Sequence, residues 1–527
     1  LDKLDAVLAQ TSTSKQDAAL FADMLSLPND GRYPTLELTP EQRRQKTLEA
    51  LISQVETLAG RSPVLMILED AHWTDPTTLE AFGRVVECIR HIPVLLIVTF
   101  RLDFDAPWIG RPHVTFMAIN RLGERDSGAM IDAVVGNKPL PATIRQDIIE
   151  RTDGVPLFAR EMTKAVLEAE SESAAQRTAG GIPSPKLAVP ASLQASLMAR
   201  LDRLGPAKEV AQIGAAIGRE FSHALLTAVV AKSEPELESA LDRLIRAGLL
   251  FRHGVPPHAS YLFKHALVQD TAYGTLLREP RRALHARIAE ILEGQFNEIA
   301  ESQPELIARH CTEAGLIEKA AIFWGKAGQQ SLARSALVEA AERFTRALAQ
   351  IADAVPTTVP LHREQITFQV GLAYALMHLK GYSAPETKAS LDQARLMIER
   401  LGALEEHPED QLLPLSVLRG FWSASIHTFD GDVTCELAGQ FLALAEKQTA
   451  PDLLAFGHAI VGTSSRFVGD FVDARARYDQ AIALYASIND QSARGAAHVY
   501  ADRSVVLWLL GYPEAALADA HHALDDA

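Results

Sequence analysis

The sequence predicts a multidomain, predominantly α-helical fold that begins with a partial α/β core and ends in an all-α superhelix. Two stretches are strongly apolar: Val64–Leu68 throughout, and Pro93–Phe100 except for Thr99. Such runs are typical of strands in a parallel sheet that helices cover on both faces. Most other stretches show helical spacing, and a helix-pair pattern recurs after residue 300. Because 527 residues exceed one ordinary core, we expect roughly three or four domains.

Composition excludes several classes of protein. The formal net charge of -16 disfavours a general nucleic-acid surface. Cys88, Cys311 and Cys435 stand far apart, which indicates neither a disulfide scaffold nor a zinc site and favours a cytoplasmic location. No apolar run approaches the ~20 residues of a membrane span. The chain opens on Leu1 without a methionine, so we expect a fragment whose N-terminus lies upstream.

The first strand ends in two carboxylates, Glu69 and Asp70. Ligands of open α/β sheets bind at the carboxyl ends of the strands. An acidic pair there can hold a hydrated Mg²⁺ on a nucleotide, as the Walker B strand of a P-loop NTPase does. The alternative is a core strand that ends in a solvated Glu-Asp turn.

Arg101 follows the second strand, at the same edge of the sheet as Asp70 if a helix from about Thr77 to Ile89 makes a right-handed βαβ unit. Its guanidinium can reach a γ-phosphate there. The alternative is a surface arginine that pairs with Asp103 or Asp105. No G-x-x-x-x-G-K-[ST] loop occurs in the sequence, and in this topology it would precede Leu1. We therefore expect the chain as it stands to bind ATP poorly.

Further helices are expected on both sides of a linker. Helical spacing covers 1–27 and Thr39–Leu58 before the first strand. After residue 120 come the helices of a small lid, Arg125–Val135, Pro141–Arg151 and Phe158–Leu167. The segment Glu168–Lys186 has no apolar period and predicts a linker.

Four helices and two short strands predict a winged-helix domain: Ser192–Leu204, Ala207–Ile217, His223–Val230, Glu234–Ala247, Leu249–Arg252 and Tyr261–Lys264. Winged helices often bind DNA. Here the candidate recognition helix contains Glu236, Glu238 and Asp242, a poor surface for phosphates. Packing within the protein is the favoured role.

The last part of the chain predicts tetratricopeptide (TPR) repeats. Gly328, Ala340, Phe344 and Ala347 follow the spacing in which small residues let two helices approach while large ones fill the groove. Similar copies begin near Gly371, Gly431, Gly462 and Gly511. Such repeats offer a concave surface to a protein or peptide partner. We expect the repeats to continue beyond the chain.

Four motifs in order give the chain a family resemblance: 68–76 (LEDAHWTDP), 98–101 (VTFR), 151–158 (RTDGVPLF) and 261–270 (YLFKHALVQD). They resemble the STAND class of signalling ATPases, and more narrowly the bacterial multidomain proteins in which a class III adenylate/guanylate cyclase domain precedes an AAA-like ATPase and TPR repeats. The resemblance implies an AAA-like core within 1–120, a lid and linker at 121–185, a winged helix at 186–300 and TPR-like repeats at 301–527.

The resemblance also implies ligands and roles. Glu69 and Asp70 would be the catalytic acids, with Asp70 on Mg²⁺, and Arg101 would be the sensor arginine for ATP. Pro156 would pack against the adenine, and His265 would reach a phosphate of bound ADP. In the family an Asp often comes first in the acidic pair, whereas Glu69 comes first here. Which carboxylate serves the metal is therefore open, and so is fast hydrolysis. His265 has the alternative of a core or capping histidine.

The favoured function is the regulatory ATP-binding and TPR region of a cyclase-like signal-transduction protein, with any cyclase activity outside this chain. One alternative is the ATPase–TPR region of a transcriptional regulator. Another is a TPR scaffold whose ATPase is degenerate. We expect a cytoplasmic protein with no membrane partner and no nucleic-acid partner for this region.

Overall fold

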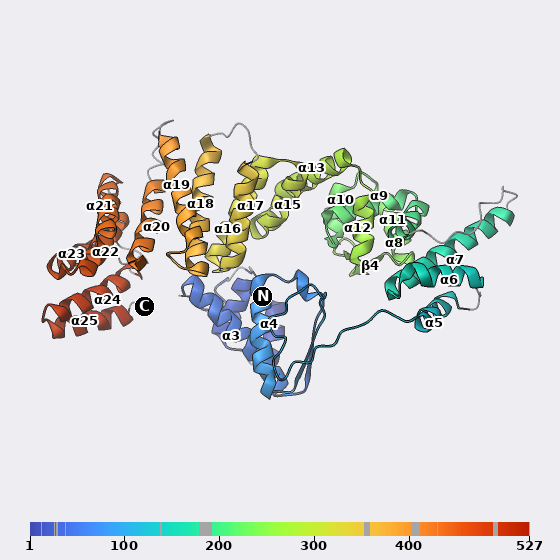
Figure 1. Cartoon of the computed structure of the whole chain (residues 1–527), viewed down its shortest axis with the longest axis horizontal. Helices are drawn as coiled ribbons and strands as arrows, with labels where there is room; N and C mark the ends of the chain where they lie inside the picture. The colour runs from blue at the N-terminus through green and yellow to red at the C-terminus, as the bar shows by residue number, and fades with distance from the viewer. Residues whose placement is uncertain are drawn as a thin grey trace. The chain divides into compact units, whose positions relative to one another are not determined.

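The structure is a computed structural model of the whole chain (Figure 1). It describes every residue except 12, 26, 28, 29, 37, 137–139, 179–191, 353–358, 403–411, 429, 449, 489–493, 526 and 527. The chain divides into two compact units, residues 1–107 with 317–527 and residues 108–316. Each unit is considered by itself.

A two-stranded parallel sheet lies in the first unit. β1 (Val64–Leu68) pairs with β2 (Val94–Val98) in a register that sets Leu65 beside Leu95 and Ile67 beside Ile97. α4 (Pro76–Cys88) connects the strands, so the expected strand–helix–strand unit is present. Asp75 caps α4 by accepting a hydrogen bond from Thr78 N at 2.8 Å.

The expectation that these strands are buried on both faces is wrong. Leu65 and Ile67 are 59% and 57% exposed, and Leu95 and Ile97 are 61% and 43% exposed. The described sheet has only two strands, and their burial alternates along the chain. One apolar face of the sheet therefore meets solvent. The sequence did not predict this exposure, because a continuous apolar run does not specify how many layers cover a strand.

The helices before the sheet differ partly from expectation. The single helix expected over 1–27 is divided into α1 (Asp2–Leu8) and α2 (Lys15–Met24). Ser14 caps α2 by accepting from Asp17 N at 3.0 Å, and a capping residue starts a new helix rather than continuing one. α3 (Pro40–Ala59) begins as expected, with a capping box between Thr39 and Gln42.

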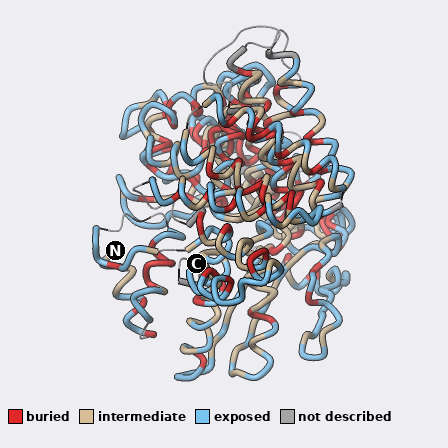
Figure 2. Tube along the Cα trace, turned by 90° about the vertical axis from the view of Figure 1, so that its left-hand side faces the viewer, coloured by how far each residue is buried: buried red, intermediate tan, exposed pale blue. Residues whose placement is uncertain are grey.

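Ten repeat helices follow in the described part of this unit, and they pack as neighbours in sequence order (Figure 1). They are α16 (Ile317–Ala333), α17 (Leu337–Ala352), α18 (Val359–Lys380), α19 (Pro385–Gly402), α20 (Leu412–Thr428), α21 (Gly431–Gln448), α22 (Pro451–Val468), α23 (Phe471–Ser487), α24 (Arg494–Leu509) and α25 (Pro513–Asp525). Buried residues gather inside the stacked helices, and exposed residues lie outside (Figure 2). The expected TPR-like helical repeats are confirmed.

The small-to-large pairing of the repeats is visible at Gly328. A Cβ at Gly328 would lie 2.7 Å from the ring of Phe344, so only glycine lets α16 and α17 approach at this level. Ala340, Phe344 and Ala347 are almost fully buried, as their spacing predicts.

The second unit begins with three helices, α5 (Glu124–Val135), α6 (Ala142–Thr152) and α7 (Pro156–Thr178). The expectation of a linker from Glu168 is wrong for its first part, because α7 continues to Thr178. Glu, Ala, Gln and Arg form helices readily without an apolar period. The rest of the expected linker, 179–186, lies outside the described residues.

The middle of this unit has the expected helices and strands, plus one strand that the sequence did not predict. The order is α8 (Leu193–Arg203), α9 (Pro206–Ile217), β3 (Glu220–Ser222), α10 (His223–Val229), α11 (Glu234–Arg246), β4 (Leu250–His253) and β5 (Ser260–Phe263). The strands form an antiparallel sheet in the order β3-β5-β4. The winged-helix assignment stays a prediction. The unit ends with four helices: α12 (Ala266–Gly274), α13 (Arg278–Gln295), α14 (Asn297–Ser302) and α15 (Pro304–Ala314).

Candidate functional site

The acidic loop after β1 is fixed by the end of β2. Thr99 N donates to Leu68 O at 2.9 Å, Asp70 N donates to Thr99 Oγ1 at 3.0 Å, and Ala71 N donates to Thr99 O at 2.8 Å. Asp70 has the left-handed backbone conformation (φ 54°, ψ 46°). Asp adopts this conformation more readily than most side chains. The loop is therefore held in place by the backbone of the neighbouring strand end.

Glu69 and Asp70 follow the end of β1, and Arg101 follows the end of β2 at the same edge of the sheet. Glu69 is exposed, and Asp70 is half-buried. The Arg101 guanidinium carbon lies 5.5 Å from the ring centroid of Trp73, in the loop that Asp70 opens. Among the described residues, no ion pair joins Arg101 to Asp103 or Asp105. Arg101 is exposed, and its role as the sensor arginine stays a prediction.

The acidic loop is the part of the chain at which the sequence predicts a metal ion. In the described part of the chain, no group of three or more His, Cys, Asp or Glu side chains is placed to hold a metal ion. Mg²⁺ commonly takes one or two carboxylates and completes its shell with water and substrate phosphates. Asp70, with Glu69 beside it, is the predicted magnesium ligand, and this role stays a prediction.

Pro156 is the first residue of α7, after a turn that glycine makes possible. Gly154 has φ +68°, and a Cβ there would lie 2.3 Å from Leu122 O. Leu122 N donates to Gly154 O at 2.8 Å, which ties the turn to the chain before α5. Pro156 itself is exposed, so its ring is open to a ligand.

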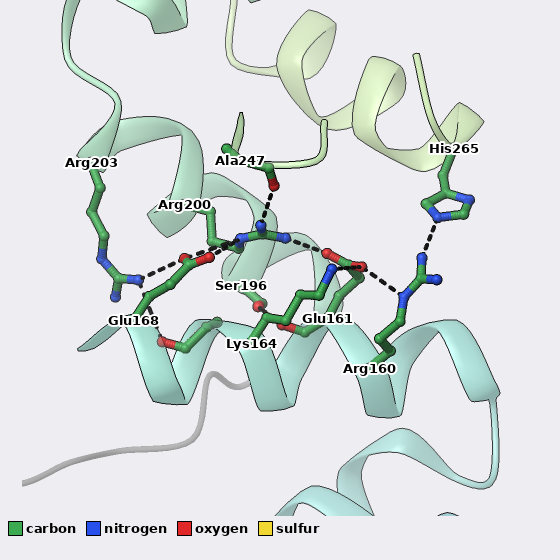
Figure 3. A network of polar contacts seen from close by, with 10 residues as sticks. Arg160, Glu161, Lys164, Glu168, Ser196, Arg200, Arg203, Ala247 and His265 are labelled. Carbon is green, nitrogen blue, oxygen red and sulfur yellow. Dashed lines mark hydrogen bonds and ion pairs between the residues drawn. The ribbon is translucent and has the colours of Figure 1, made fainter. Parts of the chain in front are cut away.

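His265 lies next to the start of α7 through Arg160. Its Nε2 atom faces the Arg160 guanidinium, and Arg160 stands one helical turn after Pro156 (Figure 3). His265 occupies the residue before α12 but makes no capping hydrogen bond with its side chain. Burial, with the Arg160 charge as the next cause, lowers the pKa of His265. Because a guanidinium can only donate, the His265 Nε2 atom accepts this hydrogen bond from Arg160.

A buried ionic network continues from Arg160 (Figure 3). Arg160 Nε lies 3.1 Å from Glu161 Oε1, and Glu161 also pairs with Arg200. Arg200 donates to Glu168 at 3.1 Å and to Ala247 O at 2.8 Å. Glu161 is 4% and Arg200 3% exposed. The network fastens α7 to α8 and to the end of α11, so it holds the position of His265 relative to Pro156.

Sequence reasoning missed Arg160, Glu161 and Arg200. A signal existed for Arg200, because it stands three residues after Leu197 and seven after Leu193, on the apolar side of its helix. A charge on that side requires a buried partner. Nothing in the sequence identified Glu161 as that partner.

The repeats offer a second candidate site, a cavity of about 320 Å³ among α23, α24 and α25. Arg503 donates to both carboxylate oxygens of Asp519, at 2.7 and 2.9 Å. The Arg475 guanidinium carbon lies 4.9 Å from the ring centroid of Tyr512. The lining residues are Arg475, Asp479, Tyr500, Arg503, Leu507, Ala515, Ala518, Asp519 and His522. Both charge signs and aromatic rings are therefore available to a partner.

None of the described helices is long and apolar enough to cross a membrane.

Comparisons with known proteins do not assign a family. No family model matches the chain. An uncharacterized protein of Rhizobium meliloti (strain 1021) is 31% identical over 314 residues, which is 59% of this chain. The chain spans only 30% of that relative's length.

Solved structures that match the chain include a STAND protein and the protein RapI, both at low TM-scores. The STAND protein with a tetratricopeptide repeat sensor from Pyrococcus horikoshii has a TM-score of 0.35 and 13% identity, over 97% of this chain and 74% of its own. The apo form of RapI has a TM-score of 0.33 and 12% identity, over 47% of this chain and 72% of its own. At these scores, the fold assignment rests on the helix pairs of this chain and not on the likenesses.

Proposed function

We propose that this chain is the nucleotide-sensing and partner-binding region of a STAND-type signalling ATPase. The observation that supports it is the loop Glu69–Asp70, fixed through Thr99 to the strand that leads to Arg101. A carboxylate pair and a guanidinium at one carboxyl edge of a parallel sheet match the needs of a magnesium-bound triphosphate. Cyclase activity, if the whole protein has it, belongs to another part of the polypeptide.

Asp70 would hold Mg²⁺ through a carboxylate oxygen, and Glu69 would orient water beside it. When bound, the metal would neutralise phosphate charge. Arg101 would sense the presence of the γ-phosphate. Within the 108–316 unit, Pro156 would contact the adenine and His265 a phosphate of ADP. Arg160 meets His265 and stands one helical turn after Pro156, which supports this pairing. A partner on the repeats would bias the nucleotide-bound states.

The test is nucleotide binding by the longest polypeptide that the gene encodes, measured by calorimetry with and without Mg²⁺. Asp70→Asn should weaken ATP binding about tenfold with Mg²⁺ and leave metal-free binding unchanged. Arg101→Gln should reduce the preference for ATP over ADP. Asp103→Asn, an exposed acid near the same edge, is the matched control. Equal ATP binding by the Asp70→Asn variant and the control would refute the proposal.

A TPR scaffold with a degenerate ATPase is the second candidate. The order of the acidic pair, in which Glu69 precedes Asp70, is the observation that favours it. The well-packed repeats and the cavity among α23, α24 and α25 would then contain the whole function. Retained partner binding by a polypeptide that binds no labelled ATP would support this candidate over the first.

A further inference from the structure

A cavity of about 580 Å³ opens between the first turns of α13 and the end of α15, away from the residues considered above. Its lining residues are Arg278, Arg281, Arg282, Thr312, Glu313 and Gly315. Three guanidinium groups face one carboxylate, so the lining has two surplus positive charges. The volume is within the usual range of about 300–1,000 Å³ for small-molecule sites.

The three arginines differ in how firmly they are held. Arg281 Nη2 donates to Leu276 O at 3.0 Å, and its guanidinium carbon lies 4.5 Å from the ring centroid of Tyr273. Arg282 donates to Ala314 O at 3.4 Å and stays 3.9 Å from Glu279. Arg278 has no hydrogen bond or ion pair among the described residues. One guanidinium is thus pre-positioned, and the others have donors left for a ligand.

The single acid of the cavity is also held in place. Tyr273 donates to Glu313 Oε2 at 3.3 Å and contacts His285 Nε2 at 2.9 Å. Glu313 is therefore directed toward Tyr273, and its single charge leaves the lining with a surplus of positive charge. Arg278 is also the first residue of α13, an 18-residue helix whose N-terminus adds partial positive charge.

We propose that this cavity binds a small molecule through its phosphate group. Guanidinium groups match phosphate oxygens with paired donors, and a dianionic phosphate would balance the surplus charge. The cavity is larger than a phosphate alone, so the ligand includes an organic part. This site goes beyond the proposed ATP site, because it shares no residue with the acidic loop.

Calorimetric titration of the whole chain with ribose 5-phosphate and with pyrophosphate tests the proposal. The titrations contain a chelator, so that no metal-dependent binding at Asp70 contributes. Arg278→Ser/Arg282→Ser should weaken binding of both probes about tenfold or more. Arg287→Ser removes an exposed arginine of α13 outside the cavity and should change binding by less than about threefold. Ribose without phosphate should not bind.

Several outcomes would overturn the proposal. One is the failure of the parent chain to bind either probe saturably, and another is equal binding by the double variant and the parent. An equal loss of probe binding in the Arg287→Ser variant would show that the probes bind by general attraction to positive charge and not in the cavity. A loss of probe binding in the Arg101→Gln variant, with none in the double variant, would place the phosphate at the predicted ATP site. Displacement of ribose 5-phosphate by a DNA duplex, with a steep salt dependence, would identify a nucleic-acid surface.

Discussion

The interior of the 108–316 unit and the interior of the repeats are stabilised by different means. In the repeats, small residues such as Gly328 face large ones such as Phe344. In the 108–316 unit, buried positions include the ion pair Glu161–Arg200 and the histidines His285 and His310. Apolar packing depends on shape alone, whereas buried polar groups depend on every partner being present. The two regions should therefore respond differently to substitution and to pH.

The largest expected effect is at the buried ion pair. Arg200→Met leaves the Glu161 carboxylate buried without its main partner and should lower the free energy of unfolding by about 3–5 kcal/mol. Urea unfolding of the chain measures it. Arg203→Met on the same helix loses a partly exposed pair with Glu168 and a long hydrogen bond of 3.4 Å to Ala165 O, and it should cost less than about 1 kcal/mol. Similar losses in the two variants would show that burial does not govern this network.

The buried histidines should make stability depend on pH. Burial lowers the pKa of His285 to about 4 and that of His310 to about 3, with the Arg309 charge as a further cause. Their Nδ1 atoms are 2.8 Å apart, so one donates to the other while both rings stay neutral. Below pH 6.5, the ordinary value, protons bind the unfolded chain first. Their stabilising contribution is complete above that pH.

As the pH falls below 6.5 toward the pKa values of the folded chain, each histidine should lower the free energy of unfolding by about 1.4 kcal/mol per pH unit. Unfolding in urea at several pH values gives this slope. His310→Gln should make the slope shallower, because one of the two titrating groups is gone. An unchanged slope in this variant would contradict the assignment.

The repeats should respond to shape instead. Gly328→Ala forces a methyl group against Phe344 and should cost about 1–3 kcal/mol in unfolding free energy. Gly439→Ala is the matched control, since a Cβ there meets nothing within 4 Å. Helix propensity should make that variant up to about 1 kcal/mol more stable. Thermal unfolding of both variants would show whether Gly328→Ala lowers the stability while Gly439→Ala raises it.

The smallest effect is expected on the open face of the sheet. Ile67 is 57% exposed, so Ile67→Thr should change the unfolding free energy by no more than about 0.5 kcal/mol. The same substitution in a strand covered on both faces would cost several times as much. A large loss of stability by denaturation would mean that another layer covers this face in solution.

The sequence predicted most helices and the site's topology, because both follow from local patterns. Apolar spacing located the repeat helices, and the two strand ends placed Asp70 and Arg101 at one edge. The covering of the strands was not predictable, since Leu65 and Ile67 have the same apolar character in a half-open sheet as in a closed one. The partners of Arg160 and Arg200 were not predictable either. Arg160 contacts His265, and Arg200 contacts Glu161. Both pairs join residues that are far apart in the sequence and meet only in the folded chain.

The open face of β1 and β2 has a practical consequence for handling the protein. In the described sheet both strands are edge strands, and each has a row of backbone donors and acceptors without a neighbouring strand. Edges of this kind can recruit strands from other molecules, which leads to aggregation. Leu65, Ile67, Leu95 and Ile97 add an apolar surface that favours the same outcome. Solubility of the isolated chain should therefore improve when charged residues replace these side chains.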